Sequence, residues 1–303
     1  GIIRKPDANE LGWKDTVRVS PLEDTIVALR PVIPAVPFDL PNSIRPLNPM
    51  MPLGSTLMFT NTDANGNPTA PIINTLTNFG WEYVWHCHIL SHEEMDMMRP
   101  ISVAIPPRAP SSLNGTISGN GTNRRSNLTW TDNSLNETAF VVQRATSPAG
   151  PWSVLASLPA NTVSYSDPIG NTTQIFFYQV IASNQVGYSG IPGYSTITTT
   201  AASNILALGP LPAAPSALTA TVQNGAQVLL SWTDNASNES GFVVERAIGS
   251  GAFSTLTVLG PKNGTGSVSF TDTTVTFGTT YSYRVRAQNA VGFSAFSNTA
   301  NVT

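Results

Sequence analysis

Charged residues are scarce in this sequence. They make up 11% of its 303 residues, whereas about 25% is typical of a soluble domain. Coiled coils and long salt-bridged helices need Glu, Lys and Arg at regular spacing, so neither is expected. The net charge of −3 argues against a nucleic-acid partner, because nucleic-acid binders present a basic face. No run of about 18 apolar residues occurs, so we expect no membrane-spanning helix.

Cysteine and histidine are rarer still. Cys87 is the single cysteine, so no disulfide can form within the chain and side-chain packing must hold the fold together. Only three histidines occur. The chain begins at Gly1 with neither an initiator Met nor a signal peptide, so we expect a processed chain or a piece of a longer protein.

Turn-forming residues, by contrast, are plentiful, with 23 Gly and 24 Pro beside abundant Thr, Ser and Asn. This composition predicts many short strands joined by turns. The chain also contains a repeat. Residues 128–145 read LTWTDNSLNETAFVVQRA, and residues 230–247 read LSWTDNASNESGFVVERA, so that Trp130 recurs as Trp232.

A second pair of related segments follows the first. Residues 177–189 read FYQVIASNQVGYS, and residues 282–294 read SYRVRAQNAVGFS. The chain from 106 to 303 is therefore predicted to hold two copies of one domain, 106–207 and 208–303. Apolar side chains alternate in each copy and share one strand face, namely Tyr178, Val180 and Ala182 in the first and Tyr283, Val285 and Ala287 in the second.

These two copies resemble fibronectin type III domains of the kind found in bacterial extracellular proteins. The resemblance depends on Trp130 and Trp232 in an early strand and on the late Tyr followed by Asn-x-x-Gly. It implies two tandem immunoglobulin-like β-sandwiches, each with a core Trp. It says almost nothing about activity, because such modules serve as spacers, adhesins and appendages of enzymes.

Residues 1–105 have a different composition. They hold all three His, the single Cys and all six Met. Short runs rich in β-branched, aromatic and other apolar residues predict strands in this region as well, at 16–20, 24–32, 55–62, 81–87 and 99–105. The proline-rich stretch 31–54 is expected to be irregular. The whole chain is thus predicted to be all-β.

One short stretch of this region concentrates groups that bind metals. Residues 86–98 read HCHILSHEEMDMM. Thiolate, imidazole and thioether form a soft ligand set that selects copper, and Cys, His and a weak axial Met are ligands of a blue-copper site, which a second His normally completes. His86 and His88 flank Cys87, so in a strand their side chains point to the face opposite Cys87.

The stretch resembles the last copper motif of the multicopper oxidases, H-C-H-x-x-x-H-x-x-x-x-M. The resemblance extends to ELGWKDTVRV at 10–19 and NFGWEYVWHCH at 78–88, and it implies that residues 1–105 are the C-terminal part of a cupredoxin-like Greek-key sandwich. It also implies that Cys87, His92 and Met97 bind type 1 copper, and that His86 and His88 bind the trinuclear copper cluster. Asp96 departs from the family, which usually has Gly before the axial residue.

A complete oxidase of this family needs about ten His, as the resemblance implies, and this chain has three. We therefore expect the chain to be the tail of a larger protein, so that it is uncertain whether the chain alone is an enzyme. About five strands are visible in 1–105, whereas a sandwich of this kind has about seven or eight. Either the N-terminal remainder of the oxidase or another copy of the chain would complete it. A metal-free remnant is the alternative for 86–97; zinc is disfavoured because Met binds it poorly.

Two functions follow from these observations. In the first, the chain is the C-terminal portion of a secreted bacterial multicopper oxidase. That enzyme couples one-electron oxidation of a metal ion or organic reductant to the reduction of oxygen to water, and the fibronectin-like modules anchor or assemble it at the cell surface. In the second, the chain is a structural or adhesive extracellular protein, and its cupredoxin piece is an assembly element that binds copper incidentally.

Overall fold

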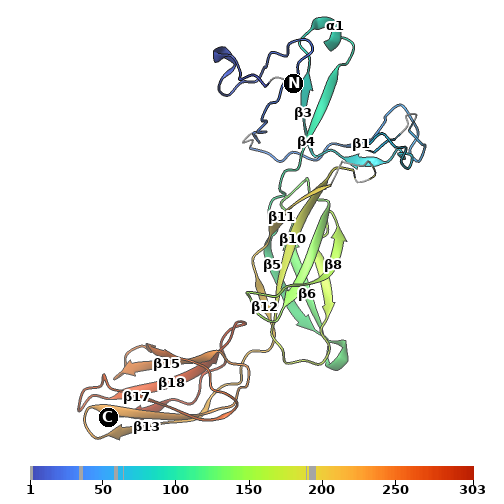
Figure 1. Ribbon diagram of the computed structural model, residues 1–303. Coiled ribbons are helices and arrows are strands. Elements are labelled where there is room, and N and C mark those ends of the chain that lie inside the picture. The colour runs from blue at the N-terminus through green and yellow to red at the C-terminus, as the bar shows by residue number, and fades with distance from the viewer. Residues whose placement is uncertain (1–2, 34–36, 58–60, 64, 189, 191–195) are drawn as a thin grey trace. The chain divides into compact units, whose positions relative to one another are not determined.

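Antiparallel β-strands make up nearly all of the regular structure (Figure 1). The computed structural model describes residues 3–33, 37–57, 61–63, 65–188, 190 and 196–303. Helical structure in these residues is limited to the four-residue α1 and two short 3-10 turns, η1 (Ala8–Glu10) and η2 (Gly121–Asn123). The predicted all-β class is confirmed. Within the described ranges, no helix is long and apolar enough to cross a membrane.

The first sandwich is built from two antiparallel sheets. One sheet has the order β5-β6-β9, and the other has the order β11-β10-β7-β8 with β12 also paired to β10. The strands are β5 (Ser111–Ser118), β6 (Arg125–Thr131), β7 (Ala139–Ala145), β8 (Ser153–Pro159), β9 (Ser164–Pro168), β10 (Phe176–Val186), β11 (Ile197–Ala202) and β12 (Leu206–Leu208).

The second sandwich repeats this plan. Its sheets have the orders β13-β14-β17 and β16-β15-β18-β19. The strands are β13 (Ser216–Gln223), β14 (Gln227–Asp234), β15 (Gly241–Ile248), β16 (Ser254–Leu259), β17 (Gly266–Asp272), β18 (Tyr281–Gln288) and β19 (Ala300–Val302). The matching orders β5-β6-β9 and β13-β14-β17 agree with the sequence repeat. The boundaries at 105/106 and 207/208 remain predictions.

A buried Trp lies in each core, as predicted. Trp232 is only 1% exposed, and its ring centre lies 5.8 Å from that of Phe242. Trp130 makes the equivalent contact with Phe140 at 5.9 Å. The alternating residues predicted for one strand face are all fully buried, namely Tyr178, Val180 and Ala182 in β10 and Tyr283, Val285 and Ala287 in β18. Period-two alternation therefore located the central strand of each sandwich.

Each core Trp is followed, after one Thr, by an Asp-Asn pair that forms an Asx turn, in which the Asp side chain accepts a hydrogen bond from the backbone two residues on. Asp132 Oδ1 accepts a hydrogen bond from the Ser134 N–H at 3.0 Å, and Asp234 Oδ1 accepts one from the Ala236 N–H at 3.0 Å. The Nδ2 groups of the next residues, Asn133 and Asn235, donate to the carbonyls of Ala109 and Ala214, each two residues before the first strand of its own sandwich.

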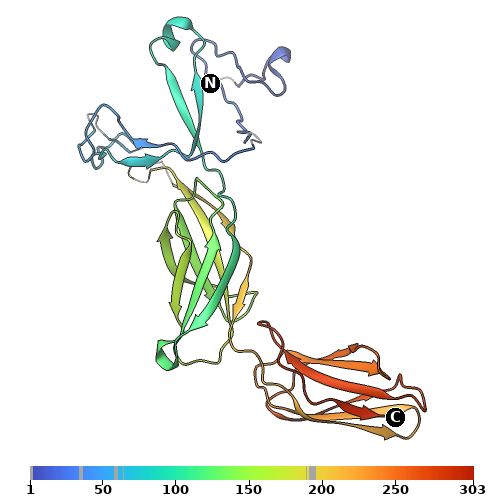
Figure 2. The same ribbon diagram turned by 180° about the vertical axis from the view of Figure 1, so that it is seen from behind.

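Two short antiparallel ribbons lie between residues 38 and 105. The β1–β2 ribbon joins β1 (Ile44–Pro46) to β2 (Leu76–Asn78). The β3–β4 ribbon joins β3 (Trp81–His86) to β4 (Met98–Val103), with α1 (Leu90–Glu93) at its tip (Figures 1 and 2). The strands predicted at 81–87 and 99–105 are therefore confirmed.

The proline-rich stretch 31–54 was predicted to be irregular, and this was wrong for β1. Three residues pair there, and Pro46 ends the pairing opposite Leu76. A proline is tolerated in a strand at the edge of a ribbon, because its missing N–H is not needed for the ladder. Of the strand predicted at 55–62, residues 58–60 lie outside the described residues, and the rest forms isolated bridges from Thr56 to Ile73 and from Thr62 to Pro68.

Residues Gly1–Pro37 form a unit separate from Phe38–Thr303. The strands predicted at 16–20 and 24–32 are wrong, because the described residues 3–33 contain no strand. The apolar side chains expected to face a core are exposed, and Ile26 is 97% exposed. Alternation describes a face that suits a half-buried sheet, but it forms a strand only when a neighbouring strand is present.

Candidate metal centre

The side chains of the candidate metal-binding motif lie at the tip of the β3–β4 ribbon. β3 ends at His86 and β4 begins at Met98, and these two residues pair in the ladder. The pairing closes the loop from Cys87 to Met97 into a hairpin connection. The ribbon therefore brings the two ends of the motif together.

Within the loop, the side chains form two pairs. Cys87 Sγ lies 3.6 Å from His92 Nδ1. The His86 and His88 rings lie next to each other, with centres 4.7 Å apart and planes inclined by 43°. Alternate residues of an extended chain share a face, which explains why His86 and His88 meet.

A single helical turn brings His92 back to Cys87. The N–H groups of His92 and Glu93 donate to the Ile89 carbonyl at 2.8 and 3.0 Å, and the Glu94 N–H donates to the Leu90 carbonyl at 2.9 Å. This turn is α1, and it explains why two residues five positions apart in sequence, Cys87 and His92, lie next to each other. An extended chain would carry His92 away from the sulfur.

Met97 is tied to the same turn through its backbone. Its N–H donates to the His92 carbonyl at 3.0 Å, while its side chain is 55% exposed. The residue before it, Asp96, has a φ of 58°, which is the left-handed region that favours glycine. Asp is among the few side chains that tolerate this conformation. Asp96 therefore occupies a backbone position that otherwise favours glycine.

The chemistry of these groups fits copper. Sulfur and imidazole nitrogen are soft donors, and His86 Nδ1 is a buried nitrogen that lacks a hydrogen-bond partner among the described residues. A buried polar atom without a partner is costly, and a bound ligand is one way to satisfy it. No group of three or more His, Cys, Asp or Glu side chains converges within the described ranges, so the motif presents pairs of donors and no closed metal site.

Both strands of the β3–β4 ribbon and the loop between them carry exposed side chains. Val84 and Trp85 of β3 are exposed, as are Ile89 and Leu90 beyond it. A two-stranded ribbon is marginally stable in water on its own. The exposed apolar groups near Cys87 are what a further layer of protein would cover.

An ion pair that the sequence did not suggest joins the two ribbons. Arg45 of β1 pairs with Glu82 of β3 at 2.5 Å, and its guanidinium carbon lies 3.8 Å from the centre of the Phe79 ring. No signal in the sequence would have found it, because the partners belong to different ribbons.

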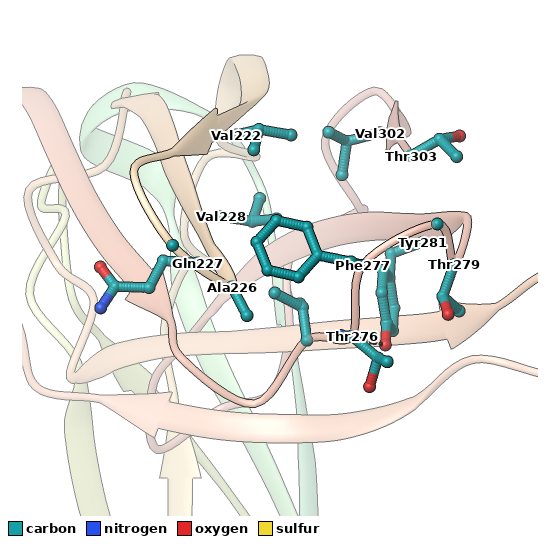
Figure 3. A pocket seen from close by; sticks show the side chains of 13 residues that line it. Val222, Ala226, Gln227, Val228, Thr276, Phe277, Thr279, Tyr281, Val302 and Thr303 are labelled. Carbon is teal, nitrogen blue, oxygen red and sulfur yellow. Dashed lines mark hydrogen bonds between the residues drawn. The ribbon is translucent and has the colours of Figure 1, made fainter.

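One hollow in the second sandwich is not suited to catalysis. It has a volume of about 50 Å³, whereas small-molecule sites occupy about 300–1,000 Å³. Figure 3 shows the Phe277 ring beside Val228 and Ala226 in a setting dominated by apolar and hydroxyl side chains. The lining contains no His, Cys, Asp or Glu.

Comparisons with known proteins identify the second sandwich. The fibronectin type III domain family matches residues 213–303, so this part of the chain is a fibronectin type III domain. Two solved structures are similar to the chain at low sequence identity. The FN1–FN3 domains of chicken CNTN1 are 18% identical, covering 65% of this chain and 66% of that one, with a TM-score of 0.28. A two-domain fibronectin type III segment from chicken tenascin is 14% identical, covering 65% and 99%, with a TM-score of 0.31.

A short stretch of the chain is similar to laccases. It is 44% identical over 43 residues to a laccase of Bacillus subtilis (strain 168), which is 14% of this chain and 8% of that protein. It is 45% identical over 40 residues to a laccase of Bacillus stratosphericus, which is 13% of this chain and 8% of that protein. The match therefore spans less than a tenth of the length of these laccases.

Proposed function

We propose that this chain is the C-terminal portion of a secreted multicopper oxidase that oxidises a metal ion or an organic reductant and reduces oxygen to water. The observation that carries the proposal is the pair of contacts at the ribbon tip, Cys87 with His92 on one side and His86 with His88 on the other. The short laccase similarity supports the same conclusion.

In this proposal, Cys87, His92 and Met97 hold type 1 copper, and His86 and His88 hold ions of the trinuclear cluster. Copper, when bound, supplies one-electron redox chemistry between the reductant and oxygen. The α1 turn keeps His92 beside the Cys87 sulfur, and Asp96 sets the backbone path to Met97. Cys87 is bonded through the backbone to His86 on one side and His88 on the other, so a short covalent path joins the two donor pairs.

The copper ligands that this chain lacks indicate what its partner would have to supply. Three His cannot complete these sites, so the N-terminal remainder of the oxidase would supply the others. The same partner would cover the apolar side chains exposed near Cys87. We favour the remainder of the oxidase over a second copy of the chain, because one segment would then supply the missing His ligands and also cover the exposed ribbon.

The sandwiches would anchor or assemble the oxidase outside the cell. Fibronectin type III domains are typically extracellular, and the second sandwich is one of them. The alternative function, a structural or adhesive extracellular protein with incidental copper binding, is favoured by the lack of a closed group of metal ligands among the described residues.

Substitution of the thiolate tests the oxidase directly. In the full-length parent protein, Cys87→Ser should abolish both the blue colour and turnover, because a hydroxyl cannot replace the soft thiolate. Met97→Leu is the matched control, and it should keep the colour and shift the reduction potential, because the axial thioether binds weakly. Undiminished turnover in Cys87→Ser would overturn the assignment of Cys87 to the copper site, whereas a parent protein with neither blue colour nor turnover would favour the structural alternative.

A further inference from the structure

A single buried amide of the first sandwich makes all its hydrogen bonds to the preceding segment of the chain. Asn184 of β10 is 0% exposed. Its Oδ1 accepts from Asn42 Nδ2 at 3.1 Å and from Asn78 Nδ2 at 3.2 Å. Its Nδ2 donates to Asn42 Oδ1 at 3.2 Å and to the Ile105 carbonyl at 3.0 Å. These bonds use the full capacity of an amide side chain.

The second sandwich provides the comparison. Asn289 occupies the same place in the Asn-x-x-Gly motif, and its Nδ2 likewise donates to a preceding carbonyl, that of Pro210, at 3.0 Å. Its Oδ1, however, accepts from the N–H groups of Val291 and Gly292 at 2.9 and 3.2 Å, so it closes its own turn. In the first sandwich the corresponding oxygen, Asn184 Oδ1, accepts instead from Asn42, just before β1, and from Asn78, the last residue of β2.

Backbone groups of the first sandwich strengthen the contact. The Gly187 N–H donates to the Asn78 carbonyl at 2.9 Å, and Asn78 Nδ2 donates to the Gln185 carbonyl at 2.7 Å. Asn42 Nδ2 also donates to the Asn136 carbonyl at 2.7 Å. The end of β2 therefore extends the sandwich by an isolated bridge.

An apolar contact completes this surface. Gly80 follows β2 with a φ of +62°, and a Cβ at this position would lie 3.0 Å from both methyl carbons of the buried Val186. It would also collide with the Val103 carbonyl. The chain can approach Val186 this closely because Gly80 has no side chain.

We propose that the first sandwich is a docking platform for residues 38–105, and that the β1–β2 ribbon is ordered only while Asn184 and Val186 hold it. Each strand of this ribbon has three residues, which is too few for independent stability in water. The first sandwich then acts as a structural part of the segment that carries Cys87, and it is more than a spacer. This inference holds whether or not the segment binds copper.

Hydrogen exchange measured by mass spectrometry on the full chain tests the proposal. In Asn184→Ala, amides of 43–47 and 76–80 should exchange about tenfold faster or more, because several buried partners lose their hydrogen bonds. The matched control is Asn289→Ala, which should speed exchange near β18 and leave 43–47 and 76–80 unchanged.

A second variant covers the case in which Asn184→Ala unfolds the first sandwich. The double substitution Asn42→Ala with Asn78→Ala removes the same bonds from the ribbon side only. It should speed exchange in 43–47 and 76–80 while β6 and β10 stay protected. Unchanged protection of 43–47 and 76–80 in the double variant, with the first sandwich intact, would overturn the proposal, because the ribbon would then fold without the platform.

Discussion

Residues 16–20 and strand β18 both alternate apolar with polar side chains, but their surroundings differ. Strand β18 lies between β15 and β19, and its Tyr283 and Val285 are fully buried in the core that contains Trp232. Residues 16–20 form no strand, and Val17 and Val19 are exposed. The comparison teaches that alternation provides an apolar face, whereas burial of that face requires strands from elsewhere in the chain or from a partner.

The largest expected effect follows from separating the two regions. Residues 1–105 expressed alone should not be a folded monomer, because their exposed apolar side chains forfeit about 1.5–3 kcal/mol each when they stay in water. Thermal melting would show no cooperative transition, and size-exclusion chromatography would show no compact monomer. Residues 208–303, the control, should melt cooperatively as a monomer. A soluble monomer of 1–105 with a sharp melt would mean that the region has a core of its own.

Two tryptophan substitutions sharpen the same comparison. Trp232→Ala in the full chain should destabilise the second sandwich by about 3–5 kcal/mol, the usual cost of truncating a large core side chain. Trp13→Ala should change the free energy of unfolding by less than about 0.5 kcal/mol, because Trp13 is 83% exposed. Denaturant unfolding followed by circular dichroism measures both. A cost below about 1 kcal/mol for Trp232→Ala would show that this Trp does not hold the core.

Much of the fold of the sandwiches could be predicted from the sequence because their information is local and repeated. Trp130 and Trp232 mark equivalent strands, and the alternating runs around Tyr178 and Tyr283 mark the buried faces. The strands predicted at 16–20 and 24–32 failed because a pairing partner is a property of the tertiary structure. No local pattern records whether that partner is present.

The candidate metal centre could be predicted in part for the same reason. Alternation explains why His86 and His88 meet, and it is visible in the sequence. The role of Asn184 could not be predicted, although its Asn-x-x-Gly motif was recognised. Its partners Asn42 and Asn78 are more than a hundred residues away, and Asn289 shows that the same motif can close on itself.

A buried carboxyl group in the second sandwich predicts a smaller, pH-dependent effect. Burial raises the pKa of Asp234, and the nearby charge of Glu239 raises it further, while Lys262 lowers it. Asp234 Oδ2 and Glu239 Oε2 both lack hydrogen-bond partners among the described residues. Because the folded pKa lies above the ordinary value of about 3.9, protonation of Asp234 stabilises the folded second sandwich. This contribution is fully present below about pH 3.9 and is lost as the pH rises through the folded pKa.

Asp234→Asn should therefore stabilise the second sandwich at neutral and alkaline pH. The amide keeps an oxygen for the Ala236 N–H and removes the buried charge, so we expect a gain of about 1 kcal/mol near pH 8 that vanishes at about pH 3. Thermal melting across this pH range measures it. Asp24→Asn, at an exposed position in the region without strands, should show no such trend. A gain that is independent of pH would mean that the charge is not its cause.

The smallest expected effect is that of Asp96→Gly, in the left-handed turn before Met97. Asp96 has a φ of 58°, and Asn161 in the first sandwich has a φ of 62°. Glycine adopts this conformation without steric cost but loses more entropy on folding. In Asp96→Gly these two effects nearly cancel, so hydrogen exchange of the Met97 and Met98 amides should change by about twofold or less. A β-branched residue is strained there, so Asp96→Val should speed this exchange about tenfold or more. Asn161→Val should act in the same direction on the amides around its own turn. If Asp96→Val leaves the exchange unchanged while Asn161→Val raises it, the tip of the β3–β4 ribbon is not held in a fixed turn, and the backbone could not bring Met97 to a metal ion bound by Cys87 and His92.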